Sequence, residues 1–148
     1  MHPVKAPNQN EYDEVKQLDG LSSSAIKKVP TFVQQTLGMW KLNKPEFQKA
    51  FRSGKRATIK PSDHSKIGNL TTVDEYKSNP KAIDSTKRER VNKLILDKKP
   101  IEMPIVLKDG KTGEMWLFAG NVRFGALSGA NTGDSTRLGP ITVHLITV

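Results

Sequence analysis

The sequence contains no cysteine among its 148 residues, which excludes disulfides, thiolate catalysis and cysteine-ligated zinc. It also lacks an apolar run near the ~18 residues that cross a bilayer, and residues 1–15 hold no apolar core of a signal peptide. Apolar residues are few, at 35%, yet more abundant than in a disordered chain. These absences predict a cytoplasmic protein without a membrane partner. The length of 148 residues predicts one domain, or one domain with an appendage.

Acidic residues are also scarce: 15 Asp and Glu stand against 24 Lys and Arg, so the formal net charge is +9. Residues 41–66 hold eight basic and two acidic residues, and residues 81–99 hold seven and three. Basic surfaces of this kind attract phosphate-rich partners, although a solvated basic face without a partner has the same composition. We therefore predict a nucleic-acid partner, contacted by Lys49, Arg52, Lys55, Arg56 and Lys60.

Apolar residues in the N-terminal third recur at helical spacing, at Ile26, Val29, Val33, Leu37 and Trp40. Because proline suits a first helical turn, this helix is expected to begin near Pro30. A second helix is expected in "NKPEFQKAFRSG", with Pro45 near its start and Gly54 at its end. A short strand is expected at residues 57–59. The chain is divided accordingly into a flexible leader (1–23), a helical, basic accessory segment (24–66) and a second domain (67–148).

The second half of the chain combines helix and strand signals, which predicts an α+β fold. A helix is expected in "TKRERVNKLILDKK", where Thr86 and Glu89 match a capping box. Strands are expected in "MPIVL", "MWLFAG" and "ITVHLITV", with a helix in "NVRFGALSGA" before the last of them. Asp109 and Gly110 predict a hairpin between the first two strands. Trp40, Trp116 and Phe118 fall on apolar positions and are expected in the core.

The turn after "MWLFAG" carries the strongest functional signal. Gly120 allows the backbone to approach a ligand closely, and the first amides of the following helix lack internal partners and can bind an anion. Arg123, in the first helical turn, could add bidentate donors to a phosphate. The same residues are also compatible with a tight turn followed by a surface arginine.

Residues 70–127 resemble the ParB/sulfiredoxin superfamily. The family's order of elements is matched by the extended segment "LTTVDEYKSNP", the helix "STKRERVNKLILDKK" and the gapless stretch "PIEMPIVLKDGKTGEMWLFAGNVRFGAL", which ends in a G-x-x-R-x-x-A box. The resemblance implies a small mixed sheet with packed helices. It also implies a triphosphate site for ATP or another nucleoside triphosphate, with Mg²⁺, lined by Gly120, Asn121, Val122 and Arg123.

Departures from the family narrow the activity that the resemblance implies. Sulfiredoxins carry a cysteine at the position of Asn121, so peroxiredoxin repair is excluded. Serine kinases of this fold carry an acidic residue at the position of Ala119, so the resemblance does not imply the catalytic role of that residue here. Partition ParB proteins continue into a helix-turn-helix, for which this chain is too short. In the family's kinases a glutamate of the extended segment acts near the phosphoryl acceptor, which implies Glu75, with Asp74 beside it, as the catalytic candidates.

The leading hypothesis is ATP-dependent phosphotransfer, by a kinase or an ATPase, on DNA or a related phosphorylated substrate, in a small phage-like protein. The alternatives are a ParB-like DNA nuclease and a non-enzymatic DNA-binding or inhibitory adaptor. The sequence has no metal-ligand spacing of the metalloprotease or nuclease type, so no protein metal site is expected. His64 could contact a phosphate or act as a base, and His144 is expected to be structural. The oligomeric state is left open.

Overall fold

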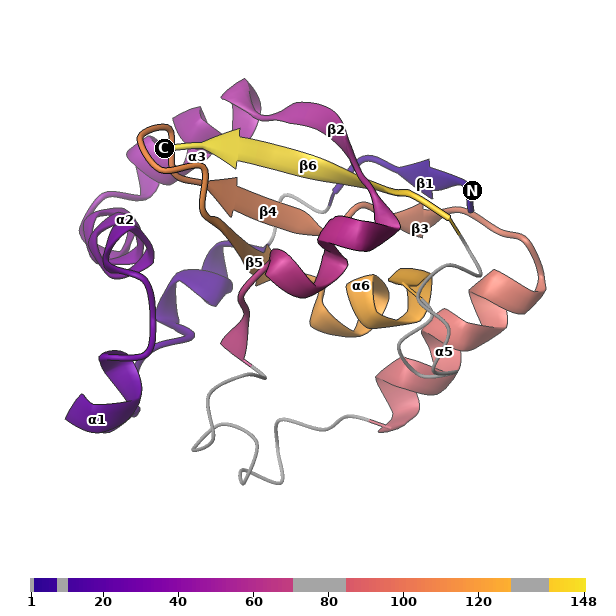
Figure 1. The fold of residues 1–148 in the computed structure, drawn as a ribbon, viewed down its shortest axis with the longest axis horizontal. Helices are drawn as coiled ribbons and strands as arrows, with labels where there is room; N and C mark the ends of the chain where they lie inside the picture. The colour runs from indigo at the N-terminus through magenta and orange to yellow at the C-terminus, as the bar shows by residue number, and fades with distance from the viewer. Residues whose placement is uncertain (1, 8–10, 71–84, 129–138) are drawn as a thin grey trace.

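A computed structural model describes residues 2–7, 11–70, 85–128 and 139–148, with the backbone alone at 85–87 (Figure 1). Helices and strands alternate irregularly along the chain, and the fold class is α+β, as predicted. In chain order the elements are β1 (Val4–Lys5), the 3-10 helix η1 (Glu11–Lys16), α1 (Ser23–Ile26), α2 (Thr31–Leu42), α3 (Lys44–Ser53), β2 (Lys55–Ile59), the 3-10 helix η2 (Pro61–Lys66), α5 (Ser85–Leu96), β3 (Ile101–Glu102), β4 (Ile105–Lys108), β5 (Met115–Ala119), α6 (Asn121–Ser128) and β6 (Ile141–Thr147).

The centre of the molecule is a four-stranded mixed sheet with the strand order β2-β6-β4-β5. The outer pairs, β2 with β6 and β4 with β5, are antiparallel, and the central pair, β4 with β6, is parallel. Strands β1 and β3 form a separate parallel pair. The predicted hairpin is present between β4 and β5. There Asp109 accepts hydrogen bonds from the Lys111 amide at 3.0 Å and from the Thr112 hydroxyl at 3.0 Å.

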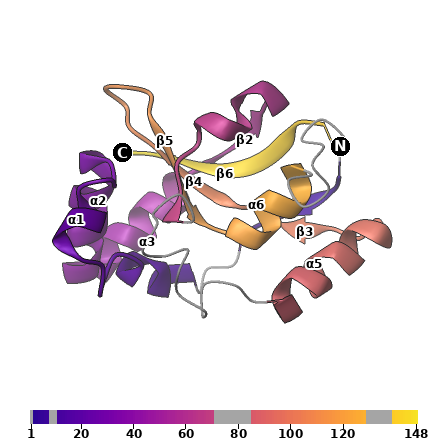
Figure 2. The ribbon, with the colours of Figure 1, turned by 60° about the horizontal axis from the view of Figure 1, so that its bottom comes forward.

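The sheet is packed on both faces, as the alternation of side chains along β4 shows. Ile105 and Leu107 belong to one core cluster, which also holds the buried residues of α2 and α3. Val106 belongs to a second cluster with residues of α5 and α6. Figures 1 and 2 accordingly show α1–α3 to one side of the sheet and α5 and α6 to the other. Successive strand residues point to opposite faces, so a strand covered on both sides reads as a continuous apolar run.

Helices α2 and α3 form where the sequence predicted them. Helix α2 begins directly after Pro30, and α3 ends at Gly54. The side chain of Asn43 caps α3 by accepting a hydrogen bond from the Glu46 amide at 3.3 Å. Trp40 is only 1% exposed, so the prediction that it belongs to the core is confirmed; Trp116 (1%) and Phe118 (2%) are likewise buried.

Residues 11–17 are packed against the sheet, which differs from the flexible leader expected from the sequence. Val15 of η1 is 1% exposed. The Gln17 amide donates to the Phe118 carbonyl at 3.0 Å, and the Trp116 indole donates to the Gln17 side-chain oxygen at 3.1 Å. The first core cluster therefore contains residues from both sides of the predicted boundary at 66/67.

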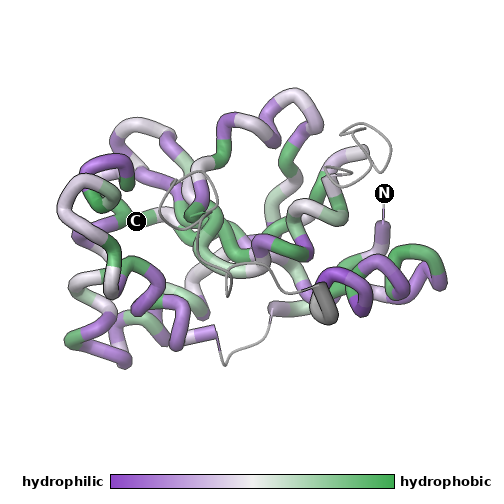
Figure 3. The backbone as a smooth tube through the Cα atoms, turned by 90° about the horizontal axis from the view of Figure 1, so that it is seen from below, coloured by the Kyte–Doolittle hydropathy of each residue, from purple (hydrophilic) through white to green (hydrophobic). Residues whose placement is uncertain are grey.

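The hydrophilic segments lie mainly in the helices at the two ends of the molecule, and the hydrophobic ones lie nearer its middle (Figure 3). Of the helices that the structure describes, none combines the length and the apolar character that a membrane span requires.

Candidate functional site

The turn between β5 and α6 has the strand–glycine–helix geometry that the sequence predicted. Gly120 has a φ of +92°, a backbone conformation that favours glycine. Its carbonyl accepts the amide of Phe124 at 2.7 Å, which starts the hydrogen bonding of α6. The amides of Asn121, Val122 and Arg123 therefore belong to the first helical turn, where helix amides lack internal partners.

The Arg123 side chain lies over this turn and is held there by two carboxylates. One terminal guanidinium nitrogen donates to Glu102 Oε2 of β3 at 3.0 Å, and the other donates to Glu11 Oε1 of η1 at 2.8 Å. A Cβ at position 120 would lie 2.8 Å from Arg123 Nη2, so the glycine makes room for the guanidinium. Arg123, 8% exposed, thus ties α6 to β3 and η1.

Of the other predicted nucleotide contacts, Val122 is packed against the second core cluster. Asn121 Oδ1 and Arg123 Nε are buried and have no hydrogen-bond partner among the described residues. A triphosphate could use the guanidinium only if the ion pairs with Glu11 and Glu102 were exchanged for phosphate contacts. Nucleotide binding by Gly120–Arg123 remains a prediction. Asp74 and Glu75, the catalytic candidates, lie outside the described residues.

The five residues predicted to contact nucleic acid are all exposed, on α3, on β2 and just after β2. The register of β2 against β6 separates two of them. Arg56 pairs with His144, whose ring packs on α3, whereas Lys55 pairs with Leu145, which packs in the second core cluster. Arg56 therefore points to the α3 side of the sheet and Lys55 to the opposite side.

We define the basic face as Lys44, Lys49, Arg52 and Arg56. At 3.6 residues per turn, its three α3 residues span an arc of about 140°. All four side chains are exposed, and no salt bridge joins them to the described part of the chain. Other cations of the same region are paired, Lys41 with Asp19 and Lys66 with Asp63. No carboxylate of the described residues is therefore paired with a cation of the basic face.

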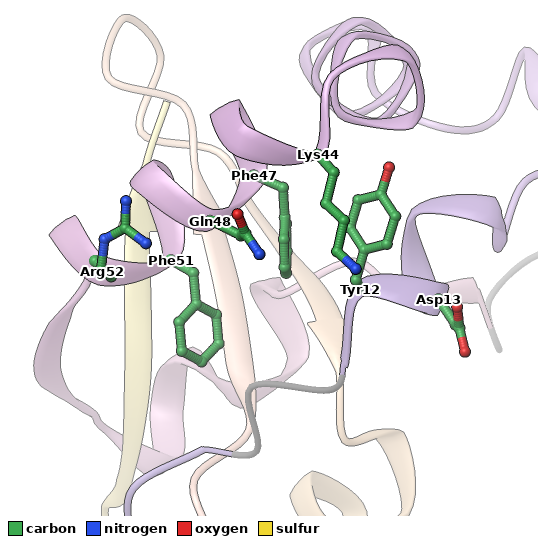
Figure 4. A pocket seen from close by; sticks show the side chains of 7 residues that line it. All are labelled: Tyr12, Asp13, Lys44, Phe47, Gln48, Phe51 and Arg52. Atoms are coloured by element: carbon green, nitrogen blue, oxygen red, sulfur yellow. The ribbon is translucent and has the colours of Figure 1, made fainter.

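A cavity of about 490 Å³ adjoins the basic face, between α3 and η1 (Figure 4). Helix α3 contributes a row of polar side chains beside a pair of aromatic rings, because its lining residues are spaced at helical intervals. Helix η1 contributes an aromatic ring and a carboxylate. The lining residues are Tyr12, Asp13, Lys44, Phe47, Gln48, Phe51 and Arg52.

The aromatic walls of this cavity are anchored to the surrounding structure. The Tyr12 hydroxyl donates to the Trp40 carbonyl at 2.7 Å, and Lys44 Nζ lies 5.2 Å from the centre of the Tyr12 ring. The Phe51 ring lies 4.9 Å from the His144 ring, centre to centre, and His144 Nε2 donates to the Phe51 carbonyl at 2.8 Å. Both half-buried rings are therefore held in place without a ligand.

Of the residues that line the cavity, the sequence predicts only Arg52 as a binding residue. A signal for its α3 side was available, because Lys44, Phe47, Gln48 and Phe51 are spaced at three and four residues, as one helix face requires. No local pattern could have added Tyr12, which reaches the cavity from a separate 3-10 helix.

His64 and His144 each pack against a phenylalanine ring. His144 makes the hydrogen bond to Phe51 described above. His64 of η2 is 8% exposed and its ring lies 5.6 Å from the Phe124 ring, centre to centre. Burial lowers the pKa of His64 below the ordinary 6.5, and the nearby Ile59 carbonyl and Asp63 carboxylate offset this only in part.

Within the described ranges, no three His, Asp or Glu side chains are grouped so that they could hold a metal ion. Comparison with known proteins gives no match, whether to a protein-family model, to a curated protein or to a solved structure.

Proposed function

We propose that this protein binds nucleic acid through the basic face. The observation that carries the proposal is the set of exposed cations on α3 and β2 that form no salt bridge with a described residue, beside an open aromatic cavity. Such cations bind the phosphate groups of nucleic acids favourably, because binding releases the counterions that surround the nucleic acid. The proposal corresponds to the DNA-binding adaptor among the hypotheses from the sequence.

A purely protective role explains only part of this charge. Strand β2 is at an edge of the sheet, and Lys and Arg on an edge strand discourage pairing with other chains. That role accounts for Lys55 and Arg56. It does not account for Lys44, Lys49 and Arg52, because these lie on a helix that has no open strand edge to protect.

The proposal is tested by fluorescence anisotropy with a fluorescein-labelled 12-mer of thymidine between 50 and 200 mM NaCl. The double variant Arg52→Gln/Arg56→Gln removes two cations of the basic face. The matched control, Arg88→Gln/Arg90→Gln, removes two exposed cations of α5 across the sheet. Each phosphate contact with a single strand contributes about 0.7 to the slope of log K against log salt.

We expect saturable binding by the unmodified protein. The α5 control should bind with nearly the same affinity and the same salt slope as the unmodified protein. The Arg52/Arg56 variant should bind more weakly, with a slope smaller by about 1.4, corresponding to two lost contacts. Absence of saturable binding, or an equal loss in the α5 control, would overturn the assignment of the interface.

The nucleotide-dependent phosphotransfer implied by the ParB/sulfiredoxin resemblance, and the fold of that family, stand as a second proposal. It is favoured by Gly120 at positive φ before α6 and by a guanidinium already bound to anionic oxygens. If a triphosphate replaces Glu11 on Arg123, Glu11→Gln should strengthen ATP or CTP binding in the presence of Mg²⁺, and Arg123→Met should abolish it. Calorimetry with no binding by either the unmodified protein or Glu11→Gln would remove this proposal.

A further inference from the structure

We infer that the cavity between α3 and η1 accepts an unpaired base of a single-stranded nucleic acid, which deepens the proposed function and rests on it. Its walls combine the two features that such binding uses, aromatic rings for stacking and cations for the adjoining phosphates. The rings come from Tyr12 and Phe51, and the cations from Lys44 and Arg52.

The aromatic rings are arranged before any ligand arrives. Tyr12 is held by its hydrogen bond to Trp40 and packs on Phe47, with 5.1 Å between ring centres. Phe51 packs on His144 from the opposite end of the cavity. Figure 4 shows the Phe47 ring between them, extending from α3. Phe47 is only 2% exposed, so it supports the other two rings. Binding a base here therefore costs little ordering of these side chains.

The charge at the rim fits a strand with phosphates on both sides of the bound base. Lys44 and Arg52 are two helical turns apart on α3, at opposite ends of the row that Gln48 completes. Among the described residues that line the cavity, Asp13 is the single carboxylate. Lys49 and Arg56, the other two cations of the basic face, are exposed and do not line the cavity, so they are available to contact further phosphates.

The cavity is large enough for an unpaired base. Its volume, about 490 Å³, lies within the roughly 300–1,000 Å³ of small-molecule sites. A base in a duplex is stacked and paired, so it would have to leave the helix before it could enter. A flexible single strand offers its bases without that cost. The inference therefore predicts a preference for single strands.

The test measures the affinity of the full chain for four probes at 100 mM NaCl. These are a thymidine 12-mer, a 12-mer with the same phosphates but abasic sites in place of all bases, a 12-base-pair A·T duplex, and thymidine monophosphate as a competitor. The variant Phe51→Leu removes one ring of the cavity. Phe32→Leu is the matched control, since Phe32 of α2 is also partly buried in the first core cluster but does not line the cavity.

We expect the unmodified protein to bind the thymidine 12-mer about tenfold more tightly than the abasic strand, in line with stacking of one base on an aromatic ring. Phe51→Leu should lose most of this preference and leave affinity for the abasic strand unchanged. Phe32→Leu should retain the preference. The comparison of the two strands on the unmodified protein needs no variant and so does not depend on the folding of Phe51→Leu.

Equal affinity for the thymidine and abasic strands would overturn this inference and leave the proposed function in place. Duplex binding as tight as single-strand binding would also overturn it. Competition by thymidine monophosphate at the concentration of the 12-mer would overturn it in favour of a site for free nucleotide. Failure to bind any of the strands would overturn the inference together with the proposed function.

Discussion

Replacing Arg123 by methionine should destabilise the protein far more than replacing an exposed arginine. The Arg123 side chain is 10% exposed, and its carboxylate partners Glu11 and Glu102 are 17% and 33% exposed. Removing one partner of a buried ion pair costs about 3–5 kcal/mol, because the remaining charge is left without compensation. Glu102 is more exposed than Glu11, so its hydration offsets part of this loss. We therefore expect a loss of about 2–4 kcal/mol in the free energy of unfolding.

The assay is urea unfolding followed by the fluorescence of Trp40 and Trp116, which are each 1% exposed in the folded protein. Arg90→Met is the control, since Arg90 is exposed on α5 and a surface substitution there should change stability by less than about 0.5 kcal/mol. A double-mutant cycle of Arg123→Met with Glu11→Gln should give a coupling energy of about 1–3 kcal/mol.

A loss of stability no larger than that of Arg90→Met would contradict the expected role of Arg123. Such a result would mean that the guanidinium is not held by Glu11 and Glu102 in solution. A large loss with no coupling to Glu11 would assign the stabilisation to Glu102 alone.

Three further predictions concern stability. Gly120→Ala should cost about 2–3 kcal/mol in urea unfolding, because alanine is strained at positive φ and its Cβ would meet the Arg123 guanidinium; a neutral result would contradict this packing. Gly54→Ala should lower the free energy of unfolding by about 1–3 kcal/mol, because the alanine Cβ would lie 2.3 Å from His144 Nε2. The loss should appear as a lower midpoint of thermal unfolding. The pKa of His64 is lower in the folded protein than in the unfolded chain, so the unfolded chain binds the proton first as the pH falls. The free energy of unfolding should therefore decrease as the pH drops below 6.5 toward the folded pKa, by at most ~1.4 kcal/mol per pH unit. His64→Leu should fall less steeply than the unmodified protein over pH 7 to 5, and parallel profiles would refute the assignment.

The parts of the fold that the sequence predicted are those set by local chemistry. The apolar spacing of α2, the Pro45 start and Gly54 end of α3, the Asp-Gly hairpin and the apolar run of β4 all depend on neighbours within a few residues. Strand β1 and helix η1 were missed for a physical reason. A two-residue strand and a 3-10 helix lack the 3.6-residue period. The partner of β1 lies 97 positions away in sequence, from Val4 to Ile101, and η1 is held by partners 28 and 112 positions away.

The candidate site follows the same division. The exposed cations of α3 and β2 could be predicted, because composition and spacing are enough to identify charge on a surface. The partners of Arg123 could not, since Glu11 is 112 positions away and nothing near Arg123 indicates a carboxylate. For the same reason the glycine at position 120 was interpreted as space for a phosphate, whereas the structure fills that space with the guanidinium.

Photocrosslinking would test directly whether nucleic acid lies on the basic face and places a base in the adjoining cavity. A thymidine 12-mer with one 5-iododeoxyuridine would be bound, irradiated and mapped by mass spectrometry of proteolytic peptides. We expect crosslinks at Tyr12 or Phe51, reduced by excess unlabelled single strand. Crosslinks confined to α5, or none that the unlabelled strand can compete away, would contradict this expectation.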